Sequence, residues 1–218
     1  MMKVEMHMHT YYSSDGLITP AEARRVLNSG KVDVIAITDH DTIAGWKEFK
    51  GRKFIRGIEK TVEEDDGNRF HLLVYFINEK IKHTGFYEVI DDVREQDGFV
   101  AIAHPYDTLR HAPHEENLEE YGRYVDGIEC INARMCVPHG NKRALDFAVK
   151  HKLVKIAGSD AHHWSEIGTA YVEADADDVE EFRKLLKLGR VSIKGGLSPI
   201  YVHTFSALRK HKLIGPKK

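Results

Sequence analysis

Short apolar runs alternate with amphipathic stretches along most of the chain. Runs that are β-branched and almost wholly apolar, such as residues 32–38, are typical of strands buried on both faces. On this pattern we expect strands over residues 4–9, 32–38, 53–58, 69–77, 99–103, 127–131, 154–158 and 191–194. Amphipathic periodicity between them predicts helices over residues 21–28, 86–96, 115–124, 141–150 and 177–188.

The alternation of strands with helices predicts an α/β fold with a parallel sheet, closed or open. Local signals agree with the pattern. Thr19 and Pro20 resemble the cap and first turn of a helix, which Gly30 would end. Asp66-Gly67 is a hairpin-type turn ahead of the strand at 69–77.

The length of 218 residues suits one large domain with a small appendage. We expect a barrel domain over residues 1–200 and a C-terminal segment over residues 201–218. The last part of that segment, residues 209–218, is basic and is expected to be a solvated or frayed terminus.

Composition narrows the function classes. Hydrophobic content of 42% and a net charge of −2 describe an ordinary globular protein without the field needed to bind duplex nucleic acid tightly. No apolar run approaches the ~20 residues of a membrane span, and no signal peptide is expected. Cys130 and Cys136 have neither redox-motif nor zinc-knuckle spacing, so we expect buried thiols and a cytoplasmic protein.

Histidine is the unusual component, with 14 copies in a chain that has two cysteines. This balance favours metals that accept nitrogen and oxygen ligands. His7 and His9 are two apart on a predicted strand, so their side chains share a face with Cα atoms ~6.6 Å apart and can converge on one cation. Taken alone, such a pair is equally consistent with a surface or core position.

The same arrangement recurs at the ends of other predicted strands. His40, Glu59 and His104 each follow or end an apolar run, and Asp160 with His162 follows another. In a barrel of parallel strands all carboxyl ends open on one face, where active sites lie. These side chains are therefore expected to meet in space and to form a metal site.

Five ordered motifs resemble the PHP (polymerase and histidinol phosphatase) family of metal-dependent phosphoesterases. They are M-H-M-H-T at 6–10, I-T-D-H at 37–40, G-I-E at 57–59, A-H-P at 103–105 and G-S-D-A-H at 158–162. The segment 71–75 after G-I-E is similar to the small stand-alone branch of that family. The resemblance implies a distorted barrel of seven β/α units with up to three metals at the carboxyl ends of its strands.

Carried over position by position, the resemblance implies three ligand sets: His7, His9, Glu59 and Asp160 for the first metal, a bridging Glu59 with His71 and His104 for the second, and Asp15, His40 and His162 for the third. Asp15 departs from members that carry histidine at that position. His83 is the alternative to His71.

The ligand types are those of Mn²⁺, Fe²⁺ or Zn²⁺ and do not choose among them. Two or three such ions would activate a water held by Glu59, His104 and Asp160, giving a bridging hydroxide that attacks phosphorus. Arg134 lies beyond a strand end and could fork onto the substrate phosphate, with a surface salt bridge as the alternative. His203 is a further candidate for the substrate phosphate, with a solvated histidine as the alternative. Asp39 is expected to orient a ligand or cap a turn.

The first hypothesis for function is a phosphatase for a nucleotide monophosphate or 3′,5′-bisphosphate. Histidinol-phosphate phosphatase and 5′→3′ exonuclease on short oligonucleotides or RNA are alternatives within the same chemistry. Amidohydrolases also begin with H-x-H on a barrel strand, but they do not account for T-D-H, A-H-P and S-D-A-H together. The non-enzyme alternative is an RNA-binding or scaffold barrel, which would be expected to have lost ligands.

Overall fold

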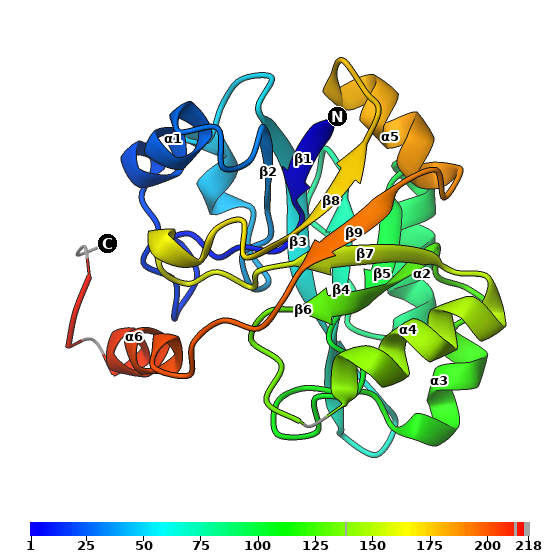
Figure 1. The fold of residues 1–218 in the computed structure, drawn as a ribbon. Coiled ribbons are helices and arrows are strands. Elements are labelled where there is room, and N and C mark those ends of the chain that lie inside the picture. The colour runs from blue at the N-terminus through cyan, green and yellow to red at the C-terminus, as the bar shows by residue number, and fades with distance from the viewer. Residues whose placement is uncertain (138, 212, 216–218) are drawn as a thin grey trace.

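The computed structural model describes residues 1–137, 139–211 and 213–215. Within them the strands are β1 (Met2–Glu5), β2 (Val34–Ile37), β3 (Phe54–Glu63), β4 (Arg69–Tyr75), β5 (Phe99–Ile102), β6 (Gly127–Asn132), β7 (Val154–Gly158), β8 (Ala170–Ala174) and β9 (Ser192–Gly195). They form one sheet in the order β7-β6-β5-β4-β3-β2-β1-β8-β9, which curls towards closure (Figure 1). The predicted α/β class and distorted barrel are confirmed.

The helices of the described residues are α1 (Pro20–Asn28), α2 (Phe86–Glu95), α3 (Glu115–Tyr121), α4 (Gly140–His151), α5 (Val179–Lys187) and α6 (Val202–Lys210), with 3-10 turns η1 (Ala44–Lys47) and η2 (Trp164–Glu166). The start of α1 is confirmed, because Thr19 and Glu22 form a capping box around Pro20. None of these helices is long and apolar enough to span a membrane. Strand β8 and helix α6 are elements that the sequence pattern missed.

The sheet is mixed, so the expected parallel arrangement holds for only part of it, whereas the predicted Asp66-Gly67 hairpin-type turn is confirmed. Strand β4 is antiparallel to β3 and β5, and β8 is antiparallel to β1 and β9, while the other pairs are parallel. The predicted strand at 53–58 continues to Glu63 and returns through the Asp66-Gly67 turn into β4. The connection is too short for the crossover that a parallel neighbour needs.

Side-chain alternation places polar groups inside the barrel. On β4, Leu72 and Val74 join the outer core beneath the helices, whereas Leu73 and Tyr75 join the inner core with His71 on the same face. Glu59 is the register partner of Leu73 and therefore faces inwards as well. Each fully buried apolar side chain contributes roughly 1.5–3 kcal/mol, which stabilises the strands that carry these polar groups.

The barrel closes where the chain leaves β1 and β7. Met8 and Ala161 form an isolated parallel bridge, and the Ala161 carbonyl accepts a hydrogen bond from the backbone N–H of His9 at 2.8 Å. The backbones approach so closely that a Cβ on Gly158 would lie 2.3 Å from the Cβ of His7. Closure therefore brings the H-x-H segment directly against the S-D-A-H segment.

The C-terminal segment differs from the expectation of a solvated terminus. Helix α6 occupies residues 202–210, and Arg209 is 8% exposed with hydrogen bonds to the carbonyls of Tyr11 and Ile214. Residues 212 and 216–218 of the predicted basic tail lie outside the described residues. The division into domains at residue 200 stays a prediction.

The two thiols also differ from each other. Cys130 is buried, as expected, but Cys136 is exposed because it lies in the loop after β6 rather than in the strand. Both are free cysteines.

Candidate metal centre

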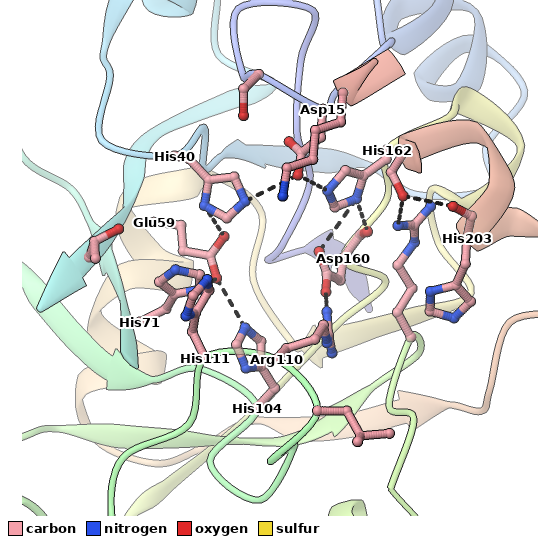
Figure 2. A pocket seen from close by; sticks show the side chains of 16 residues that line it. Asp15, His40, Glu59, His71, His104, Arg110, His111, Asp160, His162 and His203 are labelled. Carbon is pink, nitrogen blue, oxygen red and sulfur yellow. Dashed lines mark hydrogen bonds and ion pairs between the residues drawn. The ribbon is translucent and has the colours of Figure 1, made fainter. Parts of the chain in front are cut away.

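The structure brings all nine predicted ligands together at one end of the barrel. Their polar atoms surround or underlie a cavity of about 430 Å³. Figure 2 shows Asp15, His40, Glu59, His71, His104, Asp160 and His162 directed towards this cavity. His7 and His9 are fully buried beside them. That these side chains hold metal stays a prediction, which the geometry below supports.

Glu59 is the centre of the cluster. Its Oε2 lies 3.1 Å from His9 Nε2, 3.1 Å from His40 Nδ1 and 3.3 Å from His7 Nε2. Although it is buried among three nitrogens, this oxygen makes no hydrogen bond of acceptable geometry. A buried polar atom without a partner is costly. A cation shared by the oxygen and the imidazoles would remove that cost.

The second oxygen of Glu59 faces a different pair of imidazoles. Oε1 lies 2.9 Å from His71 Nδ1 and 3.1 Å from His104 Nε2. Because the two oxygens address separate sets of nitrogens, the carboxylate has the arrangement that a bridging ligand requires. His71 reaches this position from the start of β4, since β4 runs antiparallel to β3 and β5 and begins at the end where they finish.

Asp160 extends the cluster on the side of β7. Its Oδ1 lies 3.2 Å from His9 Nε2 and 3.6 Å from both His7 Nε2 and His162 Nδ1. Its Oδ2 accepts hydrogen bonds from Arg110 and from Asn132 Nδ2. One oxygen of Asp160 therefore faces the imidazoles, and the other is held from behind.

Asp15 lies at the outer side of the cluster. Its Oδ2 is 3.3 Å from His162 Nε2 and 3.6 Å from His40 Nε2. Together with His9, these residues offer four ligand atoms within 4.8 Å of one another. Aspartate at this position thus reaches the imidazoles expected to share a third metal.

Two further carboxylates orient the cluster. Glu129 accepts a hydrogen bond from His7 Nδ1 at 2.8 Å through Oε1 and one from the backbone N–H of His104 through Oε2. Asp39 accepts hydrogen bonds from the backbone N–H and hydroxyl of Thr10, so it fixes the loop between ligands. Such outer partners set ring orientation and ligand basicity. The sequence reading missed Glu129, although a carboxylate inside the apolar run at 127–131 was a usable signal.

The electrostatics show strongly coupled charges. Burial lowers the pKa of His7, but Glu129, Asp160 and Glu59 outweigh it and hold that pKa well above its ordinary value. Burial also lowers the pKa of His9, but Asp160 and Glu59 outweigh this effect and raise that pKa to about 10. The surrounding carboxylates therefore favour proton binding by this pair of imidazoles.

Two of the nine residues adopt left-handed backbone conformations. His104 has φ of 27° and Asp160 has φ of 53°, which residues with a Cβ rarely adopt. Such strain costs about 1–3 kcal/mol per residue and is concentrated at functional sites. Here it turns both side chains towards the cluster directly after their strands.

Arg134 is placed differently from the sequence expectation. It is 3% exposed, and Nε and Nη2 bind the two oxygens of Glu166 at 2.6 and 3.0 Å. Nη1 and Nη2 also donate to the Ser206 hydroxyl and the Val202 carbonyl on α6. The guanidinium of Arg134, which was expected to bind a phosphate, thus binds the carboxylate of Glu166. This ion pair is buried rather than on the surface.

Arg134 lines the cavity together with two further cations, Arg110 and Lys210, which the sequence pattern did not single out. Arg110 Nε binds Asp107 Oδ2 at 2.8 Å, and Nη2 donates to Asn132 Oδ1 at 3.1 Å. Its loop has no periodic pattern to mark it. His203 lines the cavity from α6, and its contact with a substrate phosphate stays a prediction.

The alternative to His71 lies elsewhere. His83 is exposed, and its Nδ1 is 3.0 Å from both oxygens of Asp92. His111 also lines the cavity, with its ring 4.9 Å from that of His71.

The fold and this donor set define a class of protein: a distorted α/β barrel with a histidine and carboxylate centre suited to divalent metals. The PHP domain profile matches residues 5–146, and the PHP-associated profile matches residues 138–191. Uncharacterized protein MJ0417 of Methanocaldococcus jannaschii is 30% identical over 200 residues, which cover 86% of this chain and 80% of that protein. The chain belongs to the PHP family of metal-dependent phosphoesterases.

Solved structures share the barrel. A proposed metal-dependent phosphoesterase from Bifidobacterium adolescentis aligns with a TM-score of 0.64 at 20% identity, over 91% of this chain and 98% of that one. A two-domain protein from Bacteroides vulgatus containing a predicted PHP-like metal-dependent phosphoesterase aligns with a TM-score of 0.66 at 19% identity. The alignment covers 95% of this chain and 69% of that one. The lesion-specific endonuclease PfuEndoQ from Pyrococcus furiosus aligns with a TM-score of 0.61 at 19% identity. The alignment covers 91% of this chain and 59% of that one.

Proposed function

We propose that the protein hydrolyses small phosphomonoesters, of the nucleotide monophosphate or 3′,5′-bisphosphate type, with two or three divalent ions of manganese, iron or zinc. The observation that carries this proposal is the position of Glu59, whose two oxygens face separate sets of imidazoles. Membership of a phosphoesterase family supports the reaction class.

The proposed metal sites follow the three groups of side chains. The first uses His7, His9, Glu59 and Asp160, the second Glu59, His71 and His104, and the third Asp15, His40 and His162. Bound divalent ions supply a nucleophilic water at neutral pH and neutralise charge on the phosphoryl oxygens. Glu59, His104 and Asp160 lie where they would orient that water, and Glu129 keeps the ring of His7 in place.

The cavity supports a small substrate. Its volume of about 430 Å³ lies at the lower end of the range for ligand pockets. Arg110 donates hydrogen bonds to Asp107, Asp160 and Asn132, whereas a guanidinium has five N–H donors. We therefore propose Arg110, with His203, as the contact for the substrate phosphate in place of Arg134.

A 5′→3′ exonuclease acting on short oligonucleotides is the second candidate. It is favoured by Arg110 and Lys210, which both line the cavity, because two cations there can hold successive phosphates. The PfuEndoQ barrel shows that a related fold serves an enzyme acting on nucleic acid.

A substrate panel with metal depletion tests the proposal. AMP, a 3′,5′-bisphosphate, histidinol phosphate and 5′-phosphorylated short RNA are incubated with the enzyme before and after chelation. We expect phosphate release from the nucleotides, its loss in chelator and its recovery with Mn²⁺. Full activity in protein shown by mass spectrometry to be metal-free would overturn the metal argument, and release of mononucleotides from RNA alone would favour the exonuclease.

A further inference from the structure

A carboxylate outside the metal cluster lies at the closing seam of the barrel. Glu5 ends β1 and is fully buried. Its Oε1 accepts hydrogen bonds from the backbone N–H of His7 at 3.0 Å and of Ser159 at 2.9 Å. Its Oε2 accepts from the Ser159 hydroxyl at 2.5 Å and the Gly168 N–H at 2.7 Å. One side chain therefore holds three segments of the chain together.

Two of these segments carry candidate ligands of the same metal. His7 is itself a candidate ligand, and Ser159 directly precedes Asp160. Between the two segments the backbone forms only the isolated Met8–Ala161 bridge among the described residues, not a continued ladder. Within the described part of the chain, the backbone N–H groups of His7 and Ser159 have no partner on a neighbouring strand, and the carboxylate of Glu5 accepts their hydrogen bonds instead.

The other half of the cluster is held by different contacts. His71 lies in β4, between the ladders to β3 and β5, and the backbone of His104 is held by Glu129. Glu5 has no hydrogen bond to either segment among the described residues. A change at Glu5 should therefore move the ligands of one metal relative to each other and leave the second pair of imidazoles in place.

We propose that Glu5 is a positioning residue that sets the spacing of His7 and Asp160 and thereby the affinity of the metal ion that they share. This inference rests on the proposed function, because it assumes that the cluster binds metal. A purely structural role for Glu5 would instead weaken all metal sites together through loss of the fold.

The test is a stepwise Mn²⁺ titration of metal-depleted wild type and Glu5→Gln, with free Mn²⁺ followed by electron paramagnetic resonance. Glutamine keeps the volume but turns an amide N–H₂ towards donors. We expect the ion shared by His7 and Asp160 to bind about 10- to 100-fold more weakly and the ion of His71 and His104 to bind as in wild type. Glu173→Gln, which removes a carboxylate from the neighbouring strand β8, is the matched control and should leave every step unchanged.

Ser159→Ala provides a second variant if Glu5→Gln does not fold, because it removes one hydrogen bond and keeps the charge. It should weaken the same single step by a smaller factor. Unchanged binding in the folded variants, or equal weakening of all steps, would overturn the role of Glu5 while wild-type binding upholds the metal centre. A wild-type chain that takes up no Mn²⁺ would overturn the proposed function together with this inference.

Discussion

At the scale of single residues, the site depends on one carboxylate with an unusual environment. Glu59 has imidazole nitrogens from five histidines within 3.3 Å of its two oxygens. Burial raises the pKa of Glu59, but His71, His40 and His7 outweigh it and hold that pKa well below its ordinary value. The side chain is therefore an anion under all physiological conditions, as a bridging ligand must be.

Replacing this anion should remove activity with little change of shape. We expect Glu59→Gln to lower kcat by at least ~100-fold, because bridging charge and ligand geometry are lost together. Steady-state phosphate release measures the effect. Glu63→Gln, at the exposed end of the same strand, is the control and should retain full activity. A Glu59 variant within about threefold of wild type would exclude this residue from the centre of the reaction.

At the scale of elements, helix α6 is tied to the ligand loop through a buried ion pair. Arg134 binds the helix through Ser206 and the Val202 carbonyl, and it pairs with Glu166. Glu166 Oε1 in turn accepts a hydrogen bond from the backbone N–H of His162 at 3.1 Å. Figure 1 shows α6 at the side of the barrel away from α3 and α4. The helix therefore forms a fixed wall of the cavity.

Lys210 is an exposed cation on α6 that lines the cavity, and it should contribute to substrate binding rather than to the catalytic step. We expect Lys210→Ala to raise KM about fivefold with kcat nearly unchanged, since a partly screened charge pair is worth about 1 kcal/mol. Lys194→Ala on β9, also exposed, is the control. Initial-rate measurements with AMP separate the two constants, and a fall in kcat at constant KM would contradict this role.

At the scale of the whole molecule, the cluster couples metal binding to protons. Without metal, the pKa of His9 lies at about 10 and that of His7 well above its ordinary value, so this pair of imidazoles binds protons at neutral pH. A protonated imidazole cannot ligate a cation. Metal binding must therefore release protons, and affinity must rise as the pH increases towards the pKa of His9.

Calorimetry measures this linkage directly. Mn²⁺ is titrated into the metal-free protein at pH 7 in buffers that differ in ionisation enthalpy. We expect the observed heat to change linearly with that enthalpy, with a slope corresponding to released protons, and the affinity to be higher at pH 8 than at pH 6. Identical heats in all buffers would show that the two imidazoles are neutral before metal binds.

Much of this protein was readable from local sequence. Apolar runs located seven of the nine strands to within a few residues, and β3 was recognised in its first half. The positions of His40, Glu59 and His104 at the ends of apolar runs were sufficient to predict that they meet. This succeeds because side-chain periodicity and strand ends are local properties, and a barrel necessarily gathers the ends of its strands.

Contacts between distant segments were decided only by the tertiary structure. The role of Arg134 depends on Glu166, which no spacing along the chain relates to it. The same holds for Arg110 at the cavity and for Glu5 at the seam. The sequence by itself determined which ligand types flank which strands. Which partner each charged group binds was settled by packing, because hydrogen bonds and charge pairs depend on separation in space rather than in sequence.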